Sequence, residues 1–132
     1  MWVALILACT APGDKDSDSG GTPALEPTFT NVQAEVFTKS CAFSTCHAAS
    51  GSGGLSLPDA ATSYAELVGV PSEQVAEFMR VEAGNPAGSY LYMKLTEDSR
   101  ITDDPMPPSG VLLEAEKLAL IESWIAAGAE NN

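Results

Sequence analysis

Apolar side chains recur every three or four residues along several stretches of the chain, which is the pattern of an amphipathic helix. The clearest stretch is 113–127, where Leu118, Ile121 and Ile125 share one face. No stretch alternates apolar and polar residues as a half-buried strand does. Shorter stretches with helical spacing predict further helices at 30–39, 60–68, 71–79 and 89–95. The pattern therefore predicts a small all-α domain of three to five helices with long loops, covering residues 28–132.

The first residues of the chain have a different character. Residues 1–8 are apolar and are followed directly by Cys9. The segment Ile6–Cys9 resembles the lipid-attachment box of bacterial lipoproteins. We expect a signal peptide at 1–8 and lipidation of Cys9, the alternative being a buried N-terminal strand with a chance cysteine. Residues 9–27 are dominated by Gly, Ser, Asp and Pro after the cysteine, a composition typical of a flexible tether. Together these features predict a lipoprotein of the bacterial cell envelope, held on the outer membrane or facing the periplasm.

Charge narrows the possible partners. Lys and Arg number 6 and Asp and Glu number 18, which gives a formal net charge of −12. Nucleic-acid binding depends on basic side chains that neutralise phosphates, so this balance argues against it. No apolar run reaches the ~18 residues that a membrane-spanning helix needs. An acidic protein of this kind suits a partner protein with a basic docking face.

The segment Cys41–His47 places the single histidine of the chain directly after the second of two nearby cysteines. A zinc site needs four ligands, and only distant carboxylates remain to complete it. A disulfide between Cys41 and Cys46 suits an exported protein and leaves His47 without a role. In covalent haem attachment, by contrast, the two thiols bond to the vinyl groups, and the adjacent histidine is brought under the iron as an axial ligand.

The rest of the domain favours haem over the disulfide. A domain of about 105 residues with long loops has few large apolar side chains for a core of its own. A buried porphyrin would supply the missing apolar volume. It would also give a role to the predicted helix at 30–39, which leads directly into the cysteine motif.

Several segments together resemble the class I c-type cytochromes, and more narrowly the haem-binding lipoprotein domains of planctomycetes and myxobacteria. The resemblance covers about 31–129, and its carriers are C-A-F-S-T-C-H at 41–47, G-L-S-L at 54–57, G-N-P-A-G-S-Y-L-Y-M-K-L at 84–95, M-P-P at 106–108 and L-I-E-S-W-I-A-A-G-A at 120–129. It implies a cytochrome c-like fold around haem c, with thioether bonds at Cys41 and Cys46. The axial ligands it implies are His47 and Met106.

The resemblance has a further implication and one departure. It implies a contact between the first and last helices that includes Val36, Phe37 and Trp124. The usual attachment motif is C-x-x-C-H. Four residues separate the cysteines here, a rarer variant in which the two extra residues bulge outward between the thioether bonds.

Met106 also has a physical case of its own. It stands between prolines at 105 and 107, where the backbone has little freedom and a side chain is easily held toward an iron atom. A methionine ligand favours ferrous iron and raises the reduction potential. Methionine also fills gaps in cores, so packing alone is the alternative for this residue. Met93 is the main rival ligand, and Met79 is a more distant one.

The sequence therefore predicts a haem c electron carrier with His/Met ligation, working by itself or as the electron inlet of a larger redox system. It is not expected to be an enzyme, because an iron with both axial positions filled does not readily bind oxygen or peroxide. The alternative is a haem-free, disulfide-stapled interaction module on the same lipid tether. Side chains that could meet haem propionates, or simply lie at the surface, are Arg80, Tyr90, Tyr92, Lys94, Arg100 and Trp124.

Overall fold

The computed structural model describes residues 24–49 and 51–132. The expected signal peptide at 1–8, the lipidated Cys9 and most of the tether at 9–27 lie outside the described residues, so they stay predictions. Residues 24–27 are exposed and belong to no helix or strand. Within the described part, no helix has the length and apolar character needed to cross a membrane.

The described part of the chain is helical and contains no β-strand beyond isolated bridges. This confirms the all-α prediction. The elements in chain order are α1 (Phe29–Asn31), η1 (Val32–Cys41), η2 (Ser52–Gly54), α2 (Ala60–Leu67), η3 (Pro86–Gly88), α3 (Tyr90–Leu95) and α4 (Ala115–Ala126). The expected helices at 30–39, 60–68, 89–95 and 113–127 are therefore present, with ends shifted by one or two residues.

The first helix is continuous from α1 into η1. The Thr28 side chain caps its start by accepting a hydrogen bond from the Asn31 backbone N–H. The η1 part is a π-helix, and its last turn closes with a bond from the Ala42 N–H to the Phe37 carbonyl. A π-helix of this length is uncommon and is more often found at functional sites. It ends at Cys41, so the first cysteine of the motif sits on the final turn of a helix.

The predicted helix at 71–79 is wrong. The Ser72 hydroxyl does accept bonds from the N–H groups of Gln74 and Val75, as a helix cap would. The chain then turns back instead of continuing, and Met79 forms an antiparallel bridge with Pro71. Tertiary pairing has overridden the local helical pattern here, as it commonly does in short segments.

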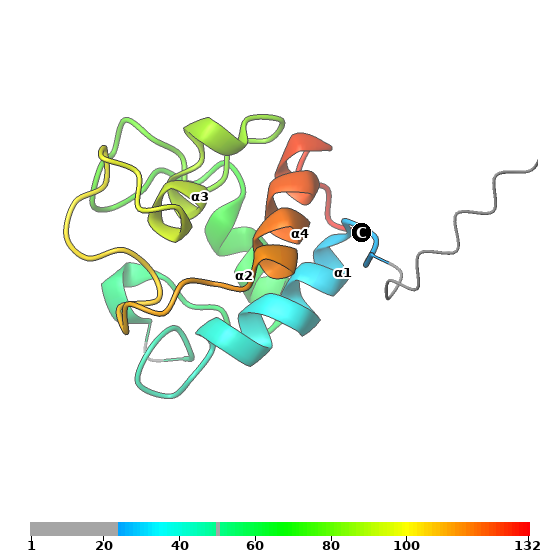
Figure 1. Ribbon diagram of the computed structural model, residues 1–132, viewed down its shortest axis with the longest axis horizontal. Helices are drawn as coiled ribbons and strands as arrows, with labels where there is room; N and C mark the ends of the chain where they lie inside the picture. Colours follow the sequence, from blue (N-terminus) through cyan, green and yellow to red (C-terminus); the bar gives the residue numbers. More distant parts are fainter. Residues whose placement is uncertain (1–23, 50) are drawn as a thin grey trace, which may run out of the picture.

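The core is centred on Phe29. Its ring lies 5.1 Å from the rings of both Tyr64 and Trp124, measured between centroids. Val36, Phe37 and Trp124 are all buried in this same core, and η1 packs against α4 (Figure 1). The contact between the first and last helices is thus present.

The long loops lie together on the opposite side of the molecule. The segment after η1 and the segment that leads into α4 run along the same side in Figure 1. They enclose the cavity described next. The walls of the candidate site thus come from these loops together with the facing residues of η1, α2 and α3.

Candidate functional site

A cavity of about 540 Å³ lies between the loops and the helical core. Its volume falls within the ~300–1,000 Å³ typical of ligand and cofactor pockets. Four of the predicted site residues line it together: Cys41, Cys46, His47 and Met106. Its apolar walls include Leu55, Leu57, Leu67, Leu91, Leu95 and Leu113. The structure therefore gathers these four site residues, of which Cys41 and Met106 are 65 positions apart in sequence, around one apolar space.

The rival methionines are placed elsewhere. Met93 is 1% exposed and Met79 is 38% exposed, and neither lines the cavity. Met106 is half-buried and belongs to the hydrophobic contacts of the core. Of the methionines in the described part of the chain, Met106 is the one at the cavity wall.

Backbone hydrogen bonds fold the motif into a compact loop. The His47 N–H donates to the Cys41 carbonyl at 3.1 Å, and the Cys46 N–H donates to the Phe43 carbonyl at 2.9 Å. On the far side, the Leu57 N–H donates to the His47 carbonyl at 2.6 Å. The two cysteines are thereby brought to the same wall as the histidine, even though four residues separate them.

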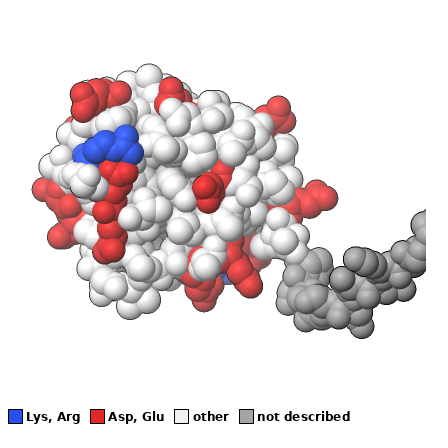
Figure 2. Space-filling view, turned by 45° about the horizontal axis from the view of Figure 1, so that its top comes forward, with Lys and Arg blue, Asp and Glu red and all other residues white. Residues whose placement is uncertain are grey.

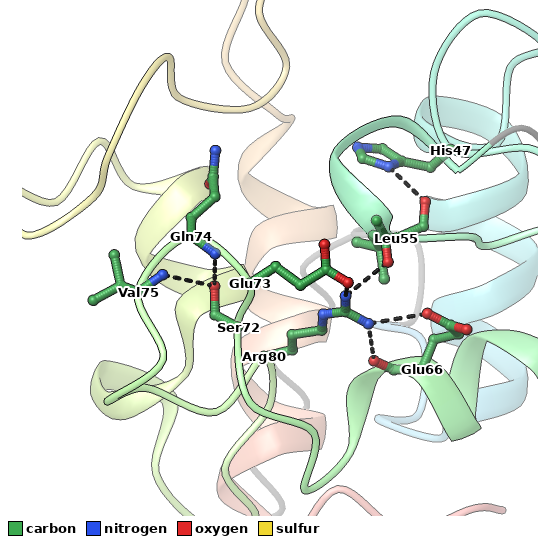
Figure 3. Close-up of polar contacts among 9 residues, drawn as sticks. His47, Leu55, Glu66, Ser72, Glu73, Gln74, Val75 and Arg80 are labelled. Atoms are coloured by element: carbon green, nitrogen blue, oxygen red, sulfur yellow. Dashed lines mark hydrogen bonds and ion pairs between the residues drawn. The ribbon is translucent and has the colours of Figure 1, made fainter.

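The imidazole of His47 is fixed in one tautomer. Its Nδ1 lies 3.0 Å from the backbone carbonyl oxygen of Leu55. A carbonyl only accepts hydrogen bonds, so Nδ1 carries a proton in this contact, and in the neutral ring the lone pair is on Nε2. In Figure 3 the ring extends away from Leu55 toward the side of Glu73 and Gln74. A histidine held through one nitrogen with the other left open has the arrangement expected of a metal ligand.

The two cysteines are free thiols in this structure. Burial, helped by the neighbouring Cys46, raises the pKa of the Cys41 thiol to about 11, while Lys117 acts in the opposite direction. Cys41 is therefore protonated at neutral pH, and a protonated thiol is a poor nucleophile for disulfide exchange.

Met106 reaches the cavity from a loop anchored on α3. Its backbone N–H donates to the carbonyl of Lys94 at 2.8 Å. The Met106–Pro107 peptide bond is cis. The side chains of Pro107 and Pro108 also line the cavity beside it. The predicted proline-flanked segment thus forms one wall of the site.

Arg80 forms a buried corner of the site, although the sequence offered it only as one of several propionate partners. Its Nη1 donates to the backbone carbonyl and to a carboxylate oxygen of Glu66, at 2.8 and 2.9 Å. Its Nη2 donates to the Gly54 carbonyl at 2.7 Å and reaches Glu73 at 3.4 Å (Figure 3). The guanidinium therefore joins α2, the end of η2 and the loop at Glu73 beside the cavity.

The other polar candidates divide into two groups. Tyr90 and Lys94 line the cavity with Arg80, whereas Tyr92, Arg100 and Trp124 do not. The indole of Trp124 instead donates to the Glu130 carbonyl inside the core. The carbonyl partners of His47 and Arg80 could not be predicted from the sequence, because every residue type offers the same backbone oxygen.

No protein-family model matches this chain, and neither a curated protein nor a solved structure is similar enough to it to count as a match. The residues that line the cavity are therefore the basis for assigning its chemistry. Two thiols, an imidazole nitrogen and a thioether surround one apolar space. In the described part of the chain, no group of three or more His, Cys, Asp or Glu side chains is arranged to hold a metal ion.

Proposed function

We propose that the protein is an electron carrier that binds haem c covalently. The observation that carries the proposal is the convergence of Cys41, Cys46, His47 and Met106 on one apolar cavity. A flat apolar group with two reactive vinyl substituents and an iron centre matches this donor set, because it uses the thiols, the nitrogen and the thioether at once.

Each of these residues has a separate role in holding the group. The Cys41 and Cys46 thiols would each add across a vinyl double bond, so that a carbon–sulfur bond forms and the thiol hydrogen passes to the neighbouring carbon. His47 would supply Nε2 to the iron, with its ring held by the Leu55 carbonyl. Met106 would supply the thioether sulfur as the second axial ligand. The bound group would provide a one-electron couple between ferric and ferrous iron.

The apolar walls support a role in electron transfer. The leucines that line the cavity exclude water, and a dry site with a methionine ligand favours the ferrous state. With His47 and Met106 both bound to the iron, the group would have no open site for a substrate. The protein would then exchange electrons with partner proteins and carry out no reaction of its own.

The protein would work at a membrane of the bacterial envelope, in exchange with other redox proteins. A signal peptide at 1–8, a lipid on Cys9 and a tether to residue 27 would hold the domain on a membrane of the bacterial envelope. The net charge of −12 supports exchange with redox proteins that present a basic docking face.

The test is to produce the full chain in cells that carry haem-maturation machinery. We expect a coloured protein whose Soret band survives acid–acetone extraction and whose mass exceeds that of the mature polypeptide by one haem. The double variant Cys41→Ser, Cys46→Ser is the matched control and should be colourless. A colourless wild-type protein with a Cys41–Cys46 bond in its peptide map would refute the proposal and support the disulfide-stapled module.

A further inference from the structure

The segment that presents Met106 has little support from its own residues. Thr102, Asp103 and Asp104 are exposed, and the segment belongs to no helix. Asp103 has a left-handed backbone conformation with φ of 60°. A loop of this kind stays in one place only when neighbouring elements hold it.

The side chain of Lys94, on α3, reaches this segment. Lys94 is 7% exposed, and its Nζ donates to the backbone carbonyl of Thr102 at 2.5 Å and to that of Asp104 at 2.9 Å. The ammonium also lies 5.6 Å from the ring centroid of Tyr90. Among the described residues it forms no ion pair with a carboxylate. A buried ammonium is costly unless its protons are bonded, so both carbonyls must stay in position.

The backbone of Lys94 holds the same segment at a third point, because its carbonyl accepts the hydrogen bond from the Met106 N–H at 2.8 Å. Two further hydrogen bonds join 102–106 to the rest of the described chain, one with Tyr90 and one with Gln74, whose side chain itself accepts a bond from the Tyr90 hydroxyl. The Tyr90 hydroxyl accepts from the Thr102 N–H at 3.0 Å, and Gln74 donates to the Asp103 carboxylate at 2.9 Å.

We propose that Lys94 is a positioning residue, whose ammonium gathers the carbonyls of Thr102 and Asp104 and so presents the Met106 sulfur to the cavity. This inference rests on the proposed role of Met106 as an iron ligand. It adds that the ligand is held from α3 by a lysine that itself makes no bond to the iron. Hydrogen bonds from charged donors are the stronger ones in proteins, so losing two of them should release the loop.

The test compares Lys94→Met with Lys39→Met in the matured full-length protein. Both variants remove one positive charge and keep a side chain of similar length. Lys39 is exposed and pairs with Glu35 on the first helix. In Lys94→Met we expect hydrogen exchange at the Thr102 and Met106 amides to become about tenfold faster or more. We also expect the methionine–iron absorption band at the red end of the spectrum to weaken and added imidazole to bind the iron about tenfold more tightly. Lys39→Met should behave as the wild type does.

Two further variants keep the test decisive. Lys94→Arg keeps charged donors and should stay closer to the wild type than Lys94→Met. Tyr90→Phe removes one hydroxyl from the same segment and should show a smaller change in the same direction, which keeps the proposal testable even where Lys94→Met does not fold. Two outcomes with a coloured wild type contradict the Lys94 proposal alone. In the first, Lys94→Met behaves as Lys39→Met does. In the second, Lys94→Met does not fold and Tyr90→Phe leaves the loop unchanged. A colourless wild type contradicts both the proposed function and the positioning of a ligand.

Discussion

At the scale of single residues, the site depends on the imidazole of His47, whose Nδ1 is hydrogen-bonded and whose Nε2 is left free. The Nδ1–H of His47 donates a hydrogen bond to the Leu55 carbonyl. This contact leaves Nε2 as the nitrogen available to a ligand in the cavity. If the proposed haem binds here, its second protein ligand should be a methionine, and position relative to the cavity separates the candidates. Met106 lies at the cavity, whereas Met93 is enclosed by protein.

Replacing Met106 by Ala should abolish the methionine–iron band at the red end of the spectrum while the thioether-bound haem is retained. Replacing Met93 by Ala should keep that band and lower the free energy of unfolding by about 2–5 kcal/mol, because it empties a buried site. Absorption spectra and urea denaturation of the two variants measure both effects. A band that survives in Met106→Ala and disappears in Met93→Ala would reverse the ligand assignment.

Arg80 should matter mainly for stability. Its side chain is 10% exposed, and replacing it by Met leaves the Gly54 and Glu66 carbonyls without their donor. Both bonds are part-buried and come from a charged donor, and since such a bond contributes about 1.5–3 kcal/mol, we expect a loss of roughly 2–4 kcal/mol in the free energy of unfolding. The ion pairs themselves add little, because the Glu66 and Glu73 carboxylates are 37% and 65% exposed.

The matched control for Arg80 is Arg100→Met. Arg100 is 47% exposed and pairs with its near neighbour Asp98, so its removal should change stability little. The midpoint of urea denaturation measures both variants, provided the slope with denaturant is unchanged. Equal midpoints for the two variants would show that Arg80 does not hold the loops together.

At the scale of elements, the sequence predicted the helices better than the loops. The helices at 60–67 and 115–126 follow from apolar spacing with a cap or a stop signal, which are local features of the chain. The segment 71–79 has the same local signals, but its two ends pair with each other at Pro71 and Met79, and Met79 also pairs with Ser89 outside the segment. The cavity was predictable to the extent that its residues carry distinctive chemistry, as Cys41 and His47 do. The carbonyl that holds His47 and the hydrogen bonds of Lys94 to 102–104 depend on the tertiary fold, which a local sequence pattern does not encode.

Helix α2 offers a pH-dependent test of a local feature. The Asp59 carboxylate caps it by accepting a bond from the Thr62 N–H at 2.9 Å, and this bond lowers the pKa of Asp59 below its usual 3.8. A lowered pKa in the folded state gives a stabilisation that is full above the unfolded pKa and is lost as pH falls through the folded value. Asp59→Ala should therefore be less stable than the wild type at pH 7, and the difference should shrink as the pH falls below about 4.

Asp59→Asn serves as the control for this cap. Asparagine caps helices about as well as aspartate does and does not titrate. Its stability relative to Asp59→Ala should therefore stay nearly constant with pH. Thermal unfolding followed by circular dichroism between about pH 3 and pH 7 measures the difference, because aspartate side chains ordinarily titrate near the lower end of this range. A pH-independent gap between the wild type and Asp59→Ala would show that the carboxylate charge contributes nothing to the cap.

At the scale of the whole molecule, the basic side chains are already engaged. Each one in the described part pairs with a carboxylate or with backbone carbonyls, and these residues are Lys39, Arg80, Lys94, Arg100 and Lys117. Acidic side chains outnumber them, and Figure 2 shows carboxylates spread over the visible face with few cations among them. The surface therefore keeps an excess of negative charge after these pairs are counted, and the resulting field attracts cationic partners within about a Debye length.

This charge predicts how electron exchange depends on salt. The bimolecular rate between the haem-loaded protein and a basic redox protein should fall about tenfold or more as ionic strength rises from about 0.01 to 0.5 M, because the Debye length shrinks from ~30 Å to a few Å. With an acidic redox protein of similar potential the rate should rise over the same range, because screening removes a repulsion. Stopped-flow absorbance at the Soret band measures both reactions. If the two partners showed the same weak dependence on salt, the net charge of −12 would have no part in choosing the partner. Recognition would then have to depend on apolar contact, for example at the hollow beside the cavity that Phe43 and Leu112 line, where these side chains are 53% and 58% exposed.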